Sequence, residues 1–232
     1  MDYEYFNIFP ITIYVGKIHE HEKYKKSFYK VYPKFDYEDN EKNNTVSENV
    51  GNPLIHLEES LDPLFSHIVD HAKVYVHDVL KCKDIFNFII TKTWISRARK
   101  VEDQIKWHIH STSHISFSYY LNMPKNSHSI KFSNPHHTNS LFLAMMVDNK
   151  KFEERNMVRE YCDENAESFF FVPPEGHVAM FPSQLSHCTE AMTDDFGGER
   201  LALVGDITLS LKEEYLHYSM GYIDPKYWKM YS

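Results

Sequence analysis

Cysteine is scarce in this chain, with three residues among 232. Cys82, Cys162 and Cys188 form no C-x-x-C pair, and an odd number at such wide spacings does not make a disulfide framework. We therefore expect three structural thiols in a protein that works in a reducing compartment.

Long apolar runs are also missing. No segment approaches the roughly 20 residues that a helix needs to cross a bilayer. The first residues, MDYEYFNIFP, carry acidic side chains where a signal peptide would be basic. The sequence therefore predicts a cytoplasmic protein without a membrane partner.

The chain has no excess of positive charge, since 33 acidic residues against 25 basic ones give a net charge of −8. Such a chain repels a phosphate backbone, and the basic residues are scattered apart from short groups such as RARK at 97–100. Nucleic acid is therefore not expected as a partner.

What the chain does have is enough apolar sequence for one substantial core. With 42% hydrophobic residues over positions 1–232, it is expected to form a single domain. Its first part, 1–90, should hold an edge strand in FNIFPITIYVGKI, a short helix at 21–30 and a loop up to residue 52. A packing helix should follow at 62–80, with Asp62 as N-cap and Pro63 at its first position.

The pattern then changes to strands. Eight short runs are rich in β-branched and aromatic residues and separated by turn signals: 87–98, 106–110, 114–123, 129–134, 140–147, 168–174, 177–183 and 199–211. They predict an all-β core of jelly-roll type at 91–211 with flanking helices, and such a core offers a mouth where ligands can meet. An aromatic C-terminal tail at 212–232 needs cover, from the roll or from a second subunit in a homodimer.

Two histidines one residue apart raise the first functional question. In a strand, His108 and His110 point to the same face, and two imidazoles on one face suggest a metal. An H-x-H pair is weak by itself, because 15 histidines make one expected by chance. His187, after a short turn, is a candidate third ligand, and Arg200 opens an apolar strand where a buried guanidinium would want an anion.

Five pieces of the sequence, in this order, resemble the Fe(II)- and 2-oxoglutarate-dependent dioxygenases. The resemblance is to the prolyl-hydroxylase-like branch and to related phage and bacterial oxygenases. The pieces are WHIH, ISFSYYLN, SIKFSNP, FPSQLSH and ERLAL, and they span about 94–209. This resemblance implies a double-stranded β-helix (a cupin-like jelly roll) that uses Fe(II), 2-oxoglutarate and O2, most simply to hydroxylate a peptidyl or small-molecule substrate. For a phage gene, the site of action would be the host cytoplasm.

The resemblance makes His108, His110 and His187 the metal ligands. His110 stands where most of the superfamily has Asp or Glu, so the centre would carry one negative charge fewer than a 2-His-1-carboxylate site. Imidazoles also suit Zn, Cu and Ni, so the assignment of iron follows from the family alone.

The cosubstrate residues are implied in the same way. Arg200 would pair with the distal carboxylate of 2-oxoglutarate, and Tyr120 would donate a hydrogen bond to the same group. Ser116 and Ser118 share a strand face with Tyr120 and would line the cosubstrate pocket, while Tyr119 would face the packing side.

Other functional classes stay open at this stage. A three-histidine cupin dioxygenase would consume oxygen without forming succinate. A non-catalytic cupin-like protein would bind a metal or ligand without turnover, and an interaction protein would bind no iron. The charged insert 148–167 is either a solvated loop or a lid over the site.

Overall fold

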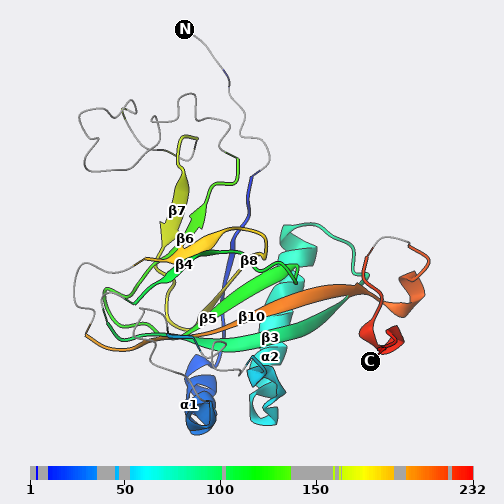
Figure 1. The fold of residues 1–232 in the computed structure, drawn as a ribbon, viewed down its shortest axis with the longest axis horizontal. Coiled ribbons are helices and arrows are strands. Elements are labelled where there is room, and N and C mark those ends of the chain that lie inside the picture. The colour runs from blue at the N-terminus through cyan, green and yellow to red at the C-terminus, as the bar shows by residue number, and fades with distance from the viewer. Residues whose placement is uncertain are drawn as a thin grey trace.

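Two antiparallel sheets form the centre of the molecule, as the computed structural model shows (Figure 1). The structure describes residues 4, 10–35, 45–46, 53–100, 103–136, 159, 162, 164–190, 197–218 and 221–231. The predicted strand 140–147 and most of the predicted lid at 148–167 lie outside these residues. Within them, no helix is both long and apolar enough to span a membrane.

The larger sheet has six strands in the order β1-β8-β5-β10-β3-β2. They are β1 (Tyr14–Lys17), β2 (Thr45–Val46), β3 (Phe86–Ala98), β5 (Ile115–Asn122), β8 (His177–Pro182) and β10 (Arg200–Leu211). The long strands β3 and β10 pair along almost their whole length, with β5 on the other side of β10 (Figure 1).

The smaller sheet has four strands in the order β4-β9-β6-β7. They are β4 (Ile105–His108), β6 (Ile130–Ser133), β7 (Ser168–Phe171) and β9 (His187–Thr189). Together the two sheets, flanked by few helices, form the jelly roll that the run pattern predicts and the double-stranded β-helix that the resemblance implies. The division at residues 90/91 stays a prediction, and β3 already begins at Phe86.

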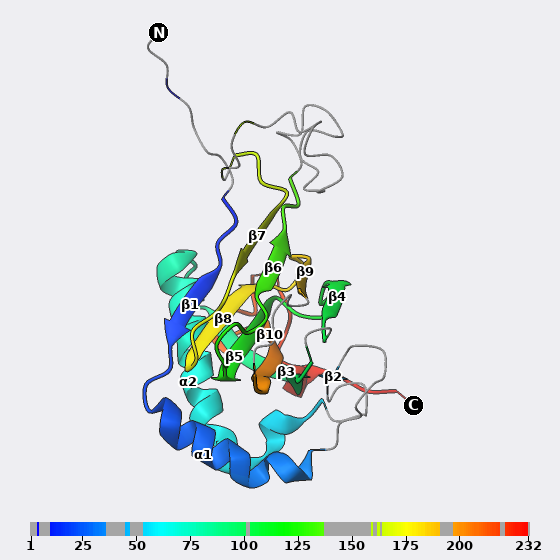
Figure 2. The ribbon, with the colours of Figure 1, turned by 90° about the vertical axis from the view of Figure 1, so that its left-hand side faces the viewer.

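Two helices cover the outer face of the larger sheet, opposite the smaller sheet (Figure 2). They are α1 (His21–Val31) and α2 (Asp62–Lys73). In α1, Tyr24, Phe28 and Val31 recur at helical spacing and are buried. They join a core that contains the outward face of β5 and β10, so the other face of these strands is left for the site.

The predicted helix 62–80 needs two corrections. The α-helix ends at Lys73 and continues as one π-helical stretch, Val74–Val79. Asp62 is the first helical residue and Leu61 precedes it as N-cap, so the acidic side chain acts in the first turn. Short 3-10 turns complete the chain: Tyr32–Lys34, Ile55–Leu57, Glu59–Leu61, Glu213–Tyr215 and Pro225–Tyr227.

Candidate metal centre

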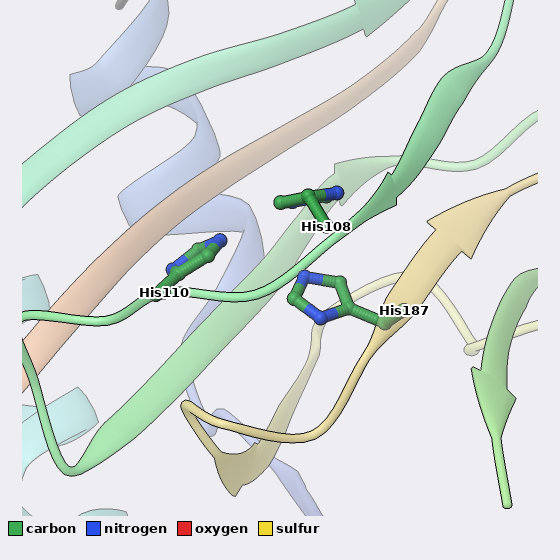
Figure 3. Close-up of side chains that lie close together, drawn as sticks. All are labelled: His108, His110 and His187. Atoms are coloured by element: carbon green, nitrogen blue, oxygen red, sulfur yellow. The ribbon is translucent and has the colours of Figure 1, made fainter.

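Three histidines converge between the two sheets (Figure 3). His108 ends β4 and His187 begins β9, and the two are direct cross-strand partners. His110 follows two residues after His108, and its backbone N–H donates to the Ser183 carbonyl at 2.9 Å. The ring centroids lie 4.2 to 5.2 Å apart, and one nitrogen from each ring falls within 4.8 Å of the others. This spacing suits three ligands of one metal ion.

Each ring is held through its Nδ1 atom. His108 and His187 direct Nδ1 at main-chain carbonyls two residues earlier, at 2.7 and 2.9 Å. His110 directs Nδ1 at the Asp206 carboxylate, at 2.6 Å. Because all three Nδ1 atoms face acceptor oxygens, they carry the protons, and the Nε2 lone pairs are left for a metal.

His187 is buried deeply enough to stay neutral. Burial, helped by the neighbouring His108, lowers the pKa of His187 to about 3. Phe181 packs against its ring with centroids 4.7 Å apart. A neutral imidazole is the form that binds a metal, so the apolar surroundings keep His187 in the form that could act as a ligand.

A buried guanidinium lies in the same cavity. Arg200 opens β10 and is 3% exposed, and its Nε atom has no hydrogen-bond partner. The Tyr120 hydroxyl is equally buried and lacks a partner, and the Arg200 guanidinium lies 5.5 Å from the centre of the Tyr120 ring. Burial lowers the pKa of Arg200 and raises the pKa of Tyr120. Two buried donors without acceptors fit a carboxylate ligand.

Ser116 and Ser118 share a strand face but have different surroundings. Ser118 lines the cavity that holds the histidines and Arg200. Ser116 lies behind His110, where its hydroxyl oxygen is 2.9 Å from His110 Nδ1 and 3.0 Å from Ser183 Oγ, and its proton is donated to Asp206 Oδ1 at 2.9 Å. Ser116 thus supports a ligand instead of lining the cosubstrate pocket as the resemblance implies. Tyr119, on the opposite face, packs in the core as expected.

The cavity has a volume of about 450 Å³ and joins the metal and anion sites. Besides His108, His110, His187, Arg200 and Ser118, it is lined by residues that the sequence did not single out, among them Trp94, Trp107, Ile109, Phe181, Val204 and Asp206. Asp206 could have been predicted from the sequence, because alternation along a strand places it on the same face as Arg200, six residues earlier. No sequence pattern pointed to Trp94, whose ring centroid lies 5.3 Å from that of His110.

A second group with metal-like spacing lies far from the cavity. It contains His21, Glu22 and Glu175. Lys25 already donates to the Glu175 carboxylate, and Tyr119 occupies His21 Nδ1 at 2.6 Å. These contacts tie α1 to the turn before β8, so we interpret the group as an ion-pair network.

Comparison with known proteins places this geometry in context. The model of a family described as "Putative 2OG-Fe(II) oxygenase" matches residues 92–206, which include the three histidines and Arg200. A comparison with curated proteins finds no match.

Solved structures share the fold at low sequence identity. A Pseudomonas putida prolyl-4-hydroxylase superposes with a TM-score of 0.51 at 10% identity, over 85% of this chain and 92% of that one. HygX from Streptomyces hygroscopicus, solved with nickel, 2-oxoglutarate and hygromycin B, gives 0.51 at 14% identity over 92% of each chain. The carbocyclase SnoK from nogalamycin biosynthesis gives 0.54 at 10% identity, over 93% and 88%. At these identities the likeness concerns the fold.

Proposed function

The chain belongs to the Fe(II)- and 2-oxoglutarate-dependent oxygenases through its core at residues 92–206, and from this premise we propose that His108, His110 and His187 hold the iron while Arg200 and Tyr120 hold 2-oxoglutarate. The enzyme uses Fe(II), 2-oxoglutarate and O2. The observation that carries the residue assignment is that one cavity is lined both by the three clustered histidines and by Arg200, whose buried Nε atom has no partner.

When bound, the iron and its cosubstrates supply the oxidising power for attack on a C–H bond, with succinate and CO2 as the other products. The protein's part is to bind and orient. The Nδ1 contacts orient each imidazole and leave its Nε2 atom for the metal. Arg200 offers a planar pair of donors to a carboxylate, and the Tyr120 hydroxyl adds a third.

The cavity walls serve to exclude water. Trp94, Phe181 and Val204 line the cavity that also contains the three histidines and Arg200. Phe181 is 1% exposed and Trp94 is 5% exposed, so neither wall is open to solvent. A dry site strengthens the pairing of Arg200 with an anion and protects the reaction from side products.

For the substrate, we propose an apolar C–H-bearing group of a peptidyl or small molecule. Trp107 and Ile109 alternate with the ligands His108 and His110, line the cavity and are about half exposed. Apolar residues at the rim of a polar centre favour a substrate that brings apolar surface to the metal. Ser111 and Thr112 add hydroxyl groups at the same rim.

The metal assignment predicts that His187→Ala loses most of its Fe(II) or Ni(II) affinity, because a three-ligand site with one imidazole removed loses both a bond and its geometry. Binding can be followed by competition with a chelating dye and by quenching of Trp94 fluorescence next to His110. His177→Ala, a histidine of β8 that does not belong to the group of three, is the matched control and should bind metal normally. Unchanged affinity in His187→Ala would contradict the assignment.

A further inference from the structure

A buried carboxylate stands behind one of the three imidazoles. Asp206 in β10 is 1% exposed, and its Oδ1 atom accepts hydrogen bonds from His110 Nδ1 at 2.6 Å and from the Ser116 hydroxyl at 2.9 Å. The pairing of β10 with β3 shifts register directly after Asp206. Such bulges bend a strand and re-aim the neighbouring side chain, so the carboxylate is aimed at His110 by the sheet itself.

Asp206 acts on the site through the ring of His110. Among the described residues, the group of possible ligand atoms within 4.8 Å of one another at this site consists of the three histidines. The Asp206 oxygen binds the far nitrogen of His110 instead. A carboxylate in this place withdraws the Nδ1 proton in part and makes Nε2 a stronger donor.

The charge of the site explains why such a contact matters. Three neutral imidazoles leave the two positive charges of a divalent ion unbalanced, whereas the usual carboxylate ligand cancels one of them. At the His110 end of the site this imbalance is costly, because the side chains of His110 and Asp206 are 8% and 2% exposed and charges there are weakly screened. Asp206 brings a carboxylate to the His110 side of the site, where the imidazole of His110 lies between it and the metal position.

We propose that Asp206 is a positioning residue that supplies, through His110, the negative charge that a carboxylate ligand supplies directly in a 2-His-1-carboxylate site. Compared with a site in which a carboxylate is itself a ligand, the carboxylate here lies one imidazole further from the metal position. This inference rests on the three-histidine metal site of the proposed function and adds to it a role for Asp206.

The first test is Asp206→Asn, which keeps the size of the side chain and removes its charge. Fe(II) and Ni(II) affinity should fall by about 10–100-fold, the range typical for loss of an outer carboxylate partner. The midpoint potential of the bound Fe(III)/Fe(II) couple should rise, because the lost negative charge stabilises Fe(III) more than Fe(II). Unchanged affinity and potential would overturn the proposal.

The matched control is Asp103→Asn. Asp103 is also a buried carboxylate, and it accepts the backbone N–H groups of Arg99 and Lys100 in the turn between β3 and β4. Its replacement should lower the free energy of unfolding and leave the midpoint potential of the Fe(III)/Fe(II) couple unchanged. An equal shift of potential in both variants would assign the effect to general destabilisation and would contradict the role of Asp206.

The decisive comparison places a carboxylate at position 110. In His110→Asp, the introduced carboxylate faces Asp206 and the two like charges repel each other. Adding Asp206→Asn removes the repulsion and leaves an amide that can donate to the introduced carboxylate, so the double variant should bind metal more tightly than His110→Asp alone. The same substitution at 206 therefore weakens binding beside histidine and strengthens it beside aspartate.

A purely structural role for Asp206 would give the same loss in both backgrounds, and that result would overturn the proposal. If Asp206→Asn alone does not fold, the comparison of His110→Asp with the double variant still decides it. Failure of the proposed function looks different, because then the unmodified chain would not bind Fe(II) or Ni(II) at all.

Discussion

At the scale of single residues, Arg200 has the least ordinary surroundings. Its guanidinium is buried with its Nε atom unsatisfied, although unsatisfied buried donors are costly. Its neighbours on the same face of β10, Ala202 and Val204, offer no acceptor side chain, and the guanidinium lies over the Tyr120 ring. These surroundings support the proposed role of Arg200 as the partner of a carboxylate ligand.

Arg200→Lys should weaken 2-oxoglutarate binding by about 1–3 kcal/mol, since lysine replaces a planar pair of donors with a point charge. Tyr120→Phe should weaken it by less, because it removes one neutral donor. Calorimetric titration with 2-oxoglutarate and Ni(II) measures both. Metal affinity should stay near that of the unmodified chain, because neither side chain belongs to the group of three histidines. An unchanged 2-oxoglutarate affinity in Arg200→Lys would make the arginine structural.

The sequence alone predicts the place of some site residues and not of others, and the difference has physical reasons. Alternation along a strand was the reason to pair His108 with His110, and their rings do lie 5.2 Å apart, although β4 ends at His108 and His110 lies beyond the strand. The same rule gives the face of Ser116 but not its depth, so Ser116 was expected in the pocket and lies behind His110. His187 lies in a three-residue strand that no periodicity reveals, so its place after a short turn made it a candidate third ligand, and the family resemblance then grouped it with His108.

At the scale of elements, β10 carries the site on one face and the core on the other. Arg200 and Asp206 lie on the cavity side, while Leu201, Leu203 and Ile207 pack under the helices. Gly205 lies on the core side between Val204 and Asp206. A β-carbon there would come within 2.6 Å of the Lys92 backbone carbonyl and 2.5 Å of the Phe117 ring. Glycine is what allows β10 to approach its neighbours this closely.

Gly205→Ala should therefore destabilise the fold by about 1–3 kcal/mol, the usual cost of overpacking a core. It should also reduce metal affinity, because the adjoining Asp206 has to move with the backbone. Urea unfolding and dye competition measure the two effects. Gly198→Ala is the control, since its added carbon would meet one ring, that of Pro124 at 2.9 Å, in an exposed bend outside the core. Equal stability of both variants would contradict the tight packing of β10.

At the scale of the whole molecule, histidines set the response to acid. Burial lowers the pKa of His56, His71 and His114 below its ordinary value of 6.5. His71 Nδ1 also meets the Tyr14 hydroxyl at 2.6 Å, which links α2 to β1. Because these pKa values are lower in the folded state, the unfolded chain binds more protons at mildly acidic pH.

The metal-free protein should therefore lose stability as pH falls through 6.5 towards the folded pKa values, with its full histidine contribution present above 6.5. Denaturant unfolding between pH of about 7.5 and about 5.5, with a chelator present, measures this slope. His71→Gln should flatten it, whereas His217→Gln, at an exposed position, should leave it unchanged. A stability that does not vary over this range would contradict the burial of these imidazoles.

The buried, unsatisfied guanidinium of Arg200 has a consequence for the life of the protein in the cell. The native state leaves the buried Nε–H group of Arg200 without an acceptor, which costs free energy, whereas the unfolded chain solvates the same group with water. Any ligand that binds the native state alone raises the free energy of unfolding by RT ln(1 + [L]/Kd). The fraction of unfolded chain, and with it exposure to proteases, thus falls as 2-oxoglutarate rises, so the amount of enzyme follows the supply of its own cosubstrate.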